Sequence, residues 1–139
     1  MSKTDRYAVV VTTVNQPTPG VKEIARGLSR LGADLIIVAD EHGPQRFDLP
    51  GAVFLDLEAQ RATGLAYAAH APTGHYARKN IGYLYALRSG ATVIVDIDDD
   101  TLPLPAFWHE RPSRAAGRVL RSGEWVNIYS YYAREPVWP

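Results

Sequence analysis

Four of the five residues from 96 to 100 are aspartates, in the order Asp-Ile-Asp-Asp-Asp. Carboxylates this close repel one another, because each negative charge raises the cost of ionising the next. The cluster follows an apolar run, residues 91–96, that is typical of a strand buried on both faces. Oxygen ligands gathered at a strand end suit a hard divalent cation, Mg²⁺ or Mn²⁺, which keeps positions for phosphate oxygens. The pattern therefore predicts a metal site that also receives a phosphate group.

Two other interpretations of the aspartates stay open. The cluster could be a solvated acidic turn in which one aspartate caps a following helix, although the prolines that come next disfavour a helix. It could also belong to a haloacid-dehalogenase-like phosphatase, which needs Asp-x-Asp-x-Thr after the first strand. Counting from Asp96 puts Asp100 at the threonine position, and counting from Asp98 puts Leu102 there. Neither register supplies the threonine, so the phosphatase interpretation is disfavoured.

The composition excludes several classes of protein. The 139 residues include 15 basic and 15 acidic side chains and no cysteine. A balanced charge provides no global field for nucleic acid or an anionic membrane, and the lack of cysteine excludes disulfides and thiol catalysis. No stretch approaches the roughly 20 apolar residues of a membrane helix, and the first apolar run is too short for a signal peptide. We expect a cytoplasmic, single-domain protein without a membrane segment, and no binding of nucleic acid.

The elements that must position the aspartates alternate between strand and helix. Apolar, β-branched runs predict four strands, at residues 7–12, 35–39, 52–55 and 91–96. Helical spacing predicts three helices, at residues 19–31, 57–61 and 75–89, capped by Thr18, Asp56 and Thr73. We expect a loop at residues 63–74, and a loop with a β-rich tail at residues 101–139, where Ser122-Gly123 could turn a hairpin. The alternation predicts an α/β fold with a mainly parallel sheet, whose ligands bind beyond the carboxyl ends of the strands.

Three blocks of sequence resemble the STELLO-type glycosyltransferase family. They are residues 9–18 (VVVTTVNQPT), 76–86 (YARKNIGYLYA) and 90–103 (GATVIVDIDDDTLP). The tail segments 126–129 (VNIY) and 136–139 (PVWP) resemble that family too, and the triple aspartate is more distantly similar to that of the reversibly glycosylated polypeptides. The resemblance implies a Rossmann-like nucleotide-diphospho-sugar transferase sheet flanked by helices, which is a type-A glycosyltransferase fold shortened at its C-terminus.

The resemblance also implies roles for single residues. Asp98 and Asp100 of the Asp-x-Asp motif would hold Mn²⁺ or Mg²⁺. The residues implied to bind the nucleotide sugar are Thr12, Thr13, Asn15, Asp40, Arg78, Lys79, Asn80, Asp98 and Asp99. Spacing alone is equally consistent with a solvated helix face for Arg78 and Lys79, and with an ordinary strand end for the two threonines. Tyr76, Tyr83 and Tyr85 are expected to pack rather than to stack on a base.

The leading hypothesis is an enzyme that binds a nucleoside diphosphate sugar with its metal ion and transfers the sugar to an unknown acceptor. No residue is assigned as the catalytic base. The alternative is a non-catalytic module that binds a nucleotide sugar or a partner, because enzymes of this fold continue well past the aspartates. Exposed aromatic residues in the tail would then favour a homo- or hetero-oligomer. If the aspartates only repel one another, Asp99→Asn should leave the metal-free domain as stable or more stable.

Overall fold

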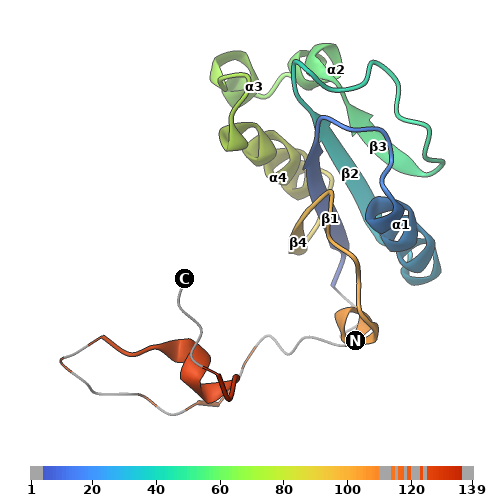
Figure 1. Cartoon of the computed structure of the whole chain (residues 1–139). Helices are drawn as coiled ribbons and strands as arrows, with labels where there is room; N and C mark the ends of the chain where they lie inside the picture. Colours follow the sequence, from blue (N-terminus) through green and yellow to red (C-terminus); the bar gives the residue numbers. More distant parts are fainter. Residues whose placement is uncertain are drawn as a thin grey trace.

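The computed structural model describes residues 5–109, 114, 116, 117, 119, 123 and 125–135. Its strands form one parallel sheet in the order β3-β2-β1-β4 (Figure 1). They are β1 (Tyr7–Thr13), β2 (Asp34–Ala39), β3 (Ala52–Leu55) and β4 (Val93–Asp98). The predicted fold class, an α/β Rossmann-like fold with a parallel sheet flanked by helices, is confirmed.

Two of the predicted helix caps are present. The helices are α1 (Pro19–Leu31), α2 (Leu57–Ala62), α3 (Ala66–His70) and α4 (Lys79–Arg88). Thr18 caps α1, because its Oγ1 accepts a hydrogen bond from the backbone N–H of Val21, and Gly32 ends this helix at a φ of 64°, in the left-handed region that favours glycine. Asp56 caps α2 by accepting from the N–H of Ala59.

Other expectations about local structure were wrong. Residues 63–74 are not only a loop, because they contain α3. The third predicted helix starts with a 3₁₀ turn, Tyr76–Arg78, capped by His75 instead of Thr73, and becomes α-helical at Lys79. The last strand runs to Asp98, so Asp96 and Asp98 lie within it. Most of its residues are at least partly exposed rather than buried, because within the described residues β4 pairs only with β1 and forms the edge of the sheet.

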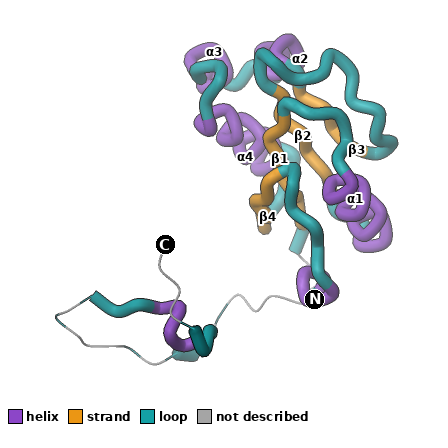
Figure 2. The backbone as a smooth tube through the Cα atoms, viewed as in Figure 1, coloured by secondary structure: helices purple, strands orange, loops and turns teal. Residues whose placement is uncertain are grey.

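Two apolar cores lie on opposite faces of the sheet, as the positions of α1 and α4 in Figure 2 show. On one face Val9 and Val11 of β1 pack with Ile24 of α1. On the other face Val10 belongs to the core that includes Ala86 of α4. This alternation follows from the two-residue period of a strand. Together the two cores hold the carboxyl ends of the strands in a fixed arrangement.

The chain after β4 returns along α1. A 3₁₀ helix, Pro105–Trp108, packs its aromatic residues against the core that includes α1. The ring of Trp108 lies 2.0 Å from the position that a Cβ atom on residue Gly27 would occupy. A second 3₁₀ helix spans Ile128–Tyr131. No strand follows Asp98 among the described residues, and position 122 of the predicted hairpin turn lies outside them. None of the helices in the described ranges has both the length and the apolar composition needed to span a membrane.

Candidate functional site

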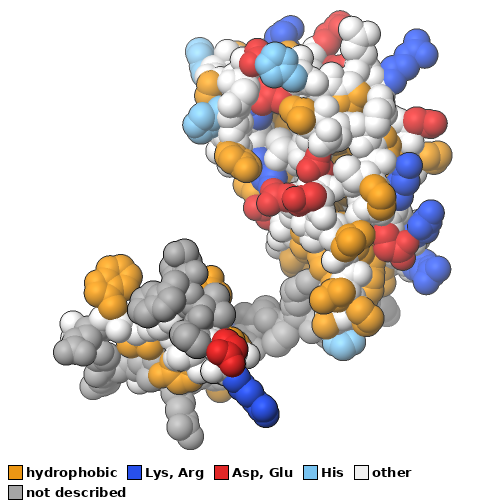
Figure 3. Space-filling view, viewed as in Figure 1, with side chains coloured by type: hydrophobic (Ala, Val, Ile, Leu, Met, Phe, Trp, Pro, Cys, Tyr) orange, Lys and Arg blue, Asp and Glu red, His pale blue; other side chains and the backbone are white. Residues whose placement is uncertain are grey.

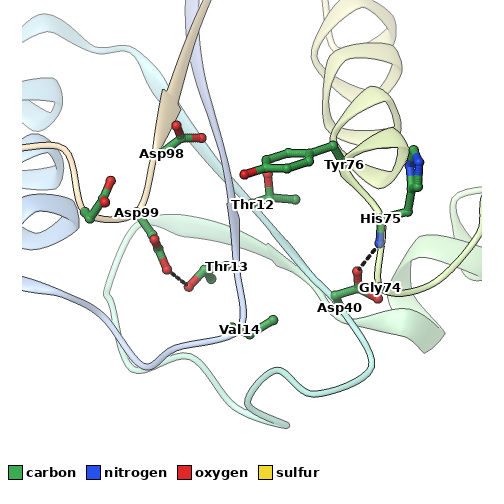
Figure 4. Close-up of a pocket in the computed structure, with 10 residues that line it drawn as sticks. Thr12, Thr13, Val14, Asp40, Gly74, His75, Tyr76, Asp98 and Asp99 are labelled. Carbon is green, nitrogen blue, oxygen red and sulfur yellow. Dashed lines mark hydrogen bonds between the residues drawn. The ribbon is translucent and has the colours of Figure 1, made fainter. Parts of the chain in front are cut away.

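A pocket of about 420 Å³ lies beyond the carboxyl ends of β1, β2 and β4 (Figure 4). Its lining residues are Thr12, Thr13, Val14, Asp40, Gly74, His75, Tyr76, Asp98, Asp99 and Asp100. The strand register explains how they meet, because Thr12 pairs with Asp98 and Thr13 pairs with Ala39. The chain leaves β1 toward β2 on one side, while β4 lies on its other side. Such a reversal of strand order opens the crevice in which α/β sheets bind ligands.

The pocket is strongly acidic. Among the described residues that line it, four are aspartates and none is a lysine or an arginine. Acidic side chains also gather around a hollow on the face that Figure 3 presents. A site with this lining attracts cations, and it repels an anion that arrives alone.

Asp99 is held in place by the loop that follows β1. Its Oδ2 accepts hydrogen bonds from Thr13 Oγ1 at 2.5 Å and from Asn15 Nδ2 at 2.9 Å. Its backbone carbonyl accepts from the hydroxyl of Thr18, the residue that caps α1. These bonds fasten the aspartate segment against the N-terminus of α1, where the helix dipole favours negative charge. Asp99 is therefore a structural member of the site as well as a lining residue.

Lys79 compensates the charge of the strand that carries the aspartates. Its Nζ lies 2.7 Å from Asp96 Oδ1 and 3.0 Å from Asp98 Oδ1, and it also donates to the carbonyl of Ile97. The side chain of Lys79 is only 8% exposed. Burial works to lower the pKa of Lys79, but the hydrogen bonds and charges of Asp96 and Asp98 outweigh it and raise the pKa above its ordinary value. Asp98 contacts Lys79 through Oδ1, and its side chain is 65% exposed.

Arg78 lies beneath the pocket in a buried polar network. Its guanidinium donates to Gln60 Oε1 from Nε and Nη2, and Nη1 donates to the carbonyl of Ala71 at 2.9 Å. Its Nε also lies 3.9 Å from Asp40 Oδ1. Gln60 is fully buried and donates in turn to the carbonyls of Ala39 and Leu55. This network joins α2, the loop before Gly74 and the end of β2.

The predicted site residues fall into three groups. Six of them line the pocket: Thr12, Thr13, Asp40, Asp98, Asp99 and Asp100. Asn15 contacts the site through Asp99. The other three are not lining residues: Arg78 and Lys79 are buried, which overturns the solvated-face interpretation, and Asn80 donates to the hydroxyl of Tyr67. Any contact of these ten residues with a ligand remains a prediction.

The sequence interpretation missed four lining residues, namely Val14, Gly74, His75 and Tyr76. The expectation that Tyr76 packs in the protein was wrong, because its side chain is 81% exposed. A helix that follows a parallel strand starts near the carboxyl edge of the sheet, so the residues just before α4 could have been considered. No such signal marked Gln60, whose burial depends on how α2 sits on the sheet.

The oxygen donors suit a metal ion that a ligand helps to coordinate. Within the part of the chain that is described, no group of three or more His, Asp or Glu side chains is arranged to hold a metal ion by itself. Asp98 has one oxygen free of Lys79, and Asp100 is exposed beside it. Mg²⁺ is commonly bound by one or two carboxylates together with water and the phosphates of its nucleotide. The two side chains are compatible with that mode of binding.

Comparison with known proteins supports the resemblance to STELLO-type glycosyltransferases. The chain is 26% identical over 166 residues to "Probable glycosyltransferase STELLO1" of Arabidopsis thaliana, and 27% identical over 160 residues to "Probable glycosyltransferase STELLO2" of the same plant. The alignments cover 99% of this chain but 20% and 19% of the two relatives, so the chain spans about a fifth of their length. No family model matches the chain. In sequence, the chain is therefore similar to part of these glycosyltransferases.

Proposed function

We propose that this chain binds a nucleoside diphosphate sugar together with Mn²⁺ or Mg²⁺, as the donor-binding part of a glycosyltransferase. One observation carries the proposal. The pocket at the switch in strand order is lined by four carboxylates without a lysine or arginine among its described lining residues. A site of this composition, in a chain similar to glycosyltransferases, is best explained by a ligand that arrives with a cation.

The size of the charge repulsion supports the need for a metal. Two like charges about 5 Å apart repel by about 3 kcal/mol at an effective dielectric constant of 20. A typical neutral hydrogen bond, such as one from Thr12, contributes only about 0.5–1.5 kcal/mol. Hydrogen bonds of this strength do not offset several carboxylate–phosphate repulsions, and the ammonium of Lys79 is already shared between Asp96 and Asp98. A divalent cation can, because it neutralises both partners.

In this proposal the aspartates have different roles. Asp98 and Asp100 hold the cation, and Asp99 keeps the segment in position through Thr13 and Asn15. The cation supplies charge neutralisation for the nucleoside diphosphate that leaves when the glycosidic bond breaks. Asp40 and Thr12, at the ends of β2 and β1, face the nucleoside. The sugar passes to an unknown acceptor.

A second candidate function is a module that binds the nucleotide sugar without turning it over. One observation favours it: no described residue after Asp100 lines the pocket. The site for an acceptor, and any catalytic base, would have to be formed by other groups. We assign no catalytic base.

Thermal unfolding with a panel of nucleoside diphosphate sugars, with and without Mn²⁺, tests the proposal. A ligand that binds only the folded state raises the melting temperature. We expect at least one sugar nucleotide with Mn²⁺ to raise it more than either does alone. If no member of the panel shifts the transition under either condition, the proposal is wrong. For a donor that does bind, release of its nucleoside diphosphate would indicate an enzyme. Binding without release would indicate a binding module.

A further inference from the structure

One lining residue differs in character from the carboxylates around it. Tyr76, the first residue of the 3₁₀ turn that leads into α4, is 81% exposed and lines the pocket. In Figure 4 its ring extends from the α4 side over Thr12, toward the strand ends that carry Asp98. A large ring left in water has lost the stabilisation that burial would give it. The pocket therefore offers a flat apolar surface next to its acidic end.

The backbone on both sides of Tyr76 is fixed. The N–H of His75 donates to Asp40 Oδ2 at 3.3 Å, and Nδ1 of the same histidine accepts from the N–H of Ala77 at 2.9 Å. The next residue, Arg78, is anchored by its buried guanidinium. Gly74, at a φ of 61°, makes the turn that brings the chain into this position. The ring is thus presented from an ordered backbone, which lowers the entropy lost when it binds a ligand.

We propose that Tyr76 is the platform on which the base of the nucleoside diphosphate stacks. The inference rests on the proposed function, which puts the diphosphate at Asp98 and Asp100. In Figure 4 Asp40 and the segment that carries Tyr76 lie across the pocket from Asp98 and Asp99, and the proposal puts the base on this side, against the ring of Tyr76. Aromatic rings stack on bases of every kind, because every base has a π face. Asp40 already accepts from two backbone N–H groups, of Glu41 and His75, and each of its oxygens retains a lone pair for an N–H of the base.

If the base stacks on Tyr76, loss of the ring should weaken ligands that carry a base and not inorganic diphosphate, and calorimetry can measure this difference. In saturating Mn²⁺, the wild-type protein and Tyr76→Ala are each titrated with uridine diphosphate, guanosine diphosphate and inorganic diphosphate. We expect Tyr76→Ala to weaken both nucleotides on the order of tenfold, because the stacked ring is lost. Inorganic diphosphate has no base, and its affinity should stay within about twofold of the wild-type value. Tyr76→Phe should bind all three ligands like the wild type, because stacking needs only the ring.

A matched control is Tyr132→Ala, which removes a ring that is 85% exposed and does not line the pocket. It should leave all three affinities unchanged. If Tyr76→Ala binds the nucleotides as the wild type does, the stacking role is wrong, while Mn²⁺-dependent binding of inorganic diphosphate still supports the proposed function. If Tyr76→Phe is as weak as Tyr76→Ala, the hydroxyl makes the contact and stacking is again wrong. If the wild type binds none of the three ligands in Mn²⁺, the proposed function fails and the stacking role fails with it.

Discussion

Two buried cations stand side by side in the sequence at the start of α4, and their surroundings differ. Arg78 donates to neutral oxygens, those of the buried Gln60 and of the half-buried loop residue Ala71, and lies 3.9 Å from the carboxylate of Asp40. Lys79 reaches the carboxylates of Asp96 and Asp98, whose side chains are 54% and 65% exposed. The first region is a largely buried scaffold, and the second adjoins the pocket through Asp98.

Two cations at the start of one helix can therefore have unrelated roles. Removing the guanidinium of Arg78 leaves the buried Oε1 of Gln60 without its donor, and an unsatisfied buried acceptor is costly. Removing the ammonium of Lys79 leaves carboxylates that stay hydrated and that a metal ion could neutralise. The two regions should therefore respond differently to substitution, to pH and to Mn²⁺.

The largest effect is expected for Arg78→Met, which keeps a long side chain but removes every donor. The buried Gln60 Oε1 and the carbonyl of Ala71 lose their partner, which should lower the free energy of unfolding by about 3 kcal/mol. Chemical denaturation measures this loss. The exposed Arg61, on the neighbouring helix α2, is the matched control, and Arg61→Met should change stability by less than about 0.5 kcal/mol. Equal losses in the two variants would mean that the network does not stabilise the fold.

A smaller effect is expected for Lys79→Met. It removes the hydrogen bonds to Asp96, Asp98 and the carbonyl of Ile97, at a cost of about 2 kcal/mol in the absence of metal. Mn²⁺ should then stabilise the variant more than the wild type, because two carboxylates have lost their counter-ion. Arg78→Met should show no such gain. Melting curves with and without Mn²⁺ measure both effects, and an equal response of the two variants to Mn²⁺ would contradict the comparison.

The contribution of Lys79 should also depend on pH. Its pKa in the folded protein lies above the ordinary value of 10.5, so the folded state holds the proton more tightly than the unfolded state. The stabilisation is complete below pH 10.5 and is lost as the pH rises through the raised pKa. The pKa of Tyr83 is also raised, by burial and by Asp96, while Lys79 acts to lower it, so both proteins in this comparison carry Tyr83→Phe to remove that titration. The difference in unfolding free energy between the proteins with and without Lys79→Met should stay constant near neutral pH and shrink above pH 10.5, and a difference that grows there would contradict this assignment.

The smallest effects separate two aspartates of the cluster. Asp99→Asn should lower stability by about 1 kcal/mol, because the charged acceptor of Thr13 and Asn15 is lost. This reverses the expectation from the sequence that the change would be neutral or stabilising. Asp100→Asn should leave stability unchanged or slightly higher, because this exposed carboxylate only adds repulsion. Unfolding curves of the two variants without metal test this difference between Asp99 and Asp100. Equal stabilities of the two variants would contradict it.

The fold could be predicted from local patterns, because apolar periodicity and capping residues act within a few positions along the chain. The caps of α1 and α2 were predicted from Thr18 and Asp56 for this reason. The burial of β4 could not be predicted in the same way. An apolar run indicates a strand, but the order of the strands decides whether it lies at the centre or at the edge of the sheet.

The candidate site, like the fold, could be predicted only where it depends on local sequence patterns. The position of the aspartates at the carboxyl edge of the sheet follows from the alternation of strands and helices, and six predicted residues do line the pocket. The partners of Arg78 could not be predicted, because Gln60 is 18 residues away and meets it only through the packing of α2. The exposure of Tyr76 likewise depends on the 3₁₀ turn in front of α4.

In the proposed function, the acidic pocket accepts a diphosphate only with a divalent cation. Calorimetric titration of the wild-type protein with uridine and guanosine diphosphates, in Mn²⁺ and then in chelator, tests it most directly. We expect measurable binding of at least one nucleotide in Mn²⁺, at least tenfold weaker binding in chelator, and a much smaller dependence on Mn²⁺ in Asp98→Asn and Asp100→Asn. Equal affinity in Mn²⁺ and in chelator would contradict the claim.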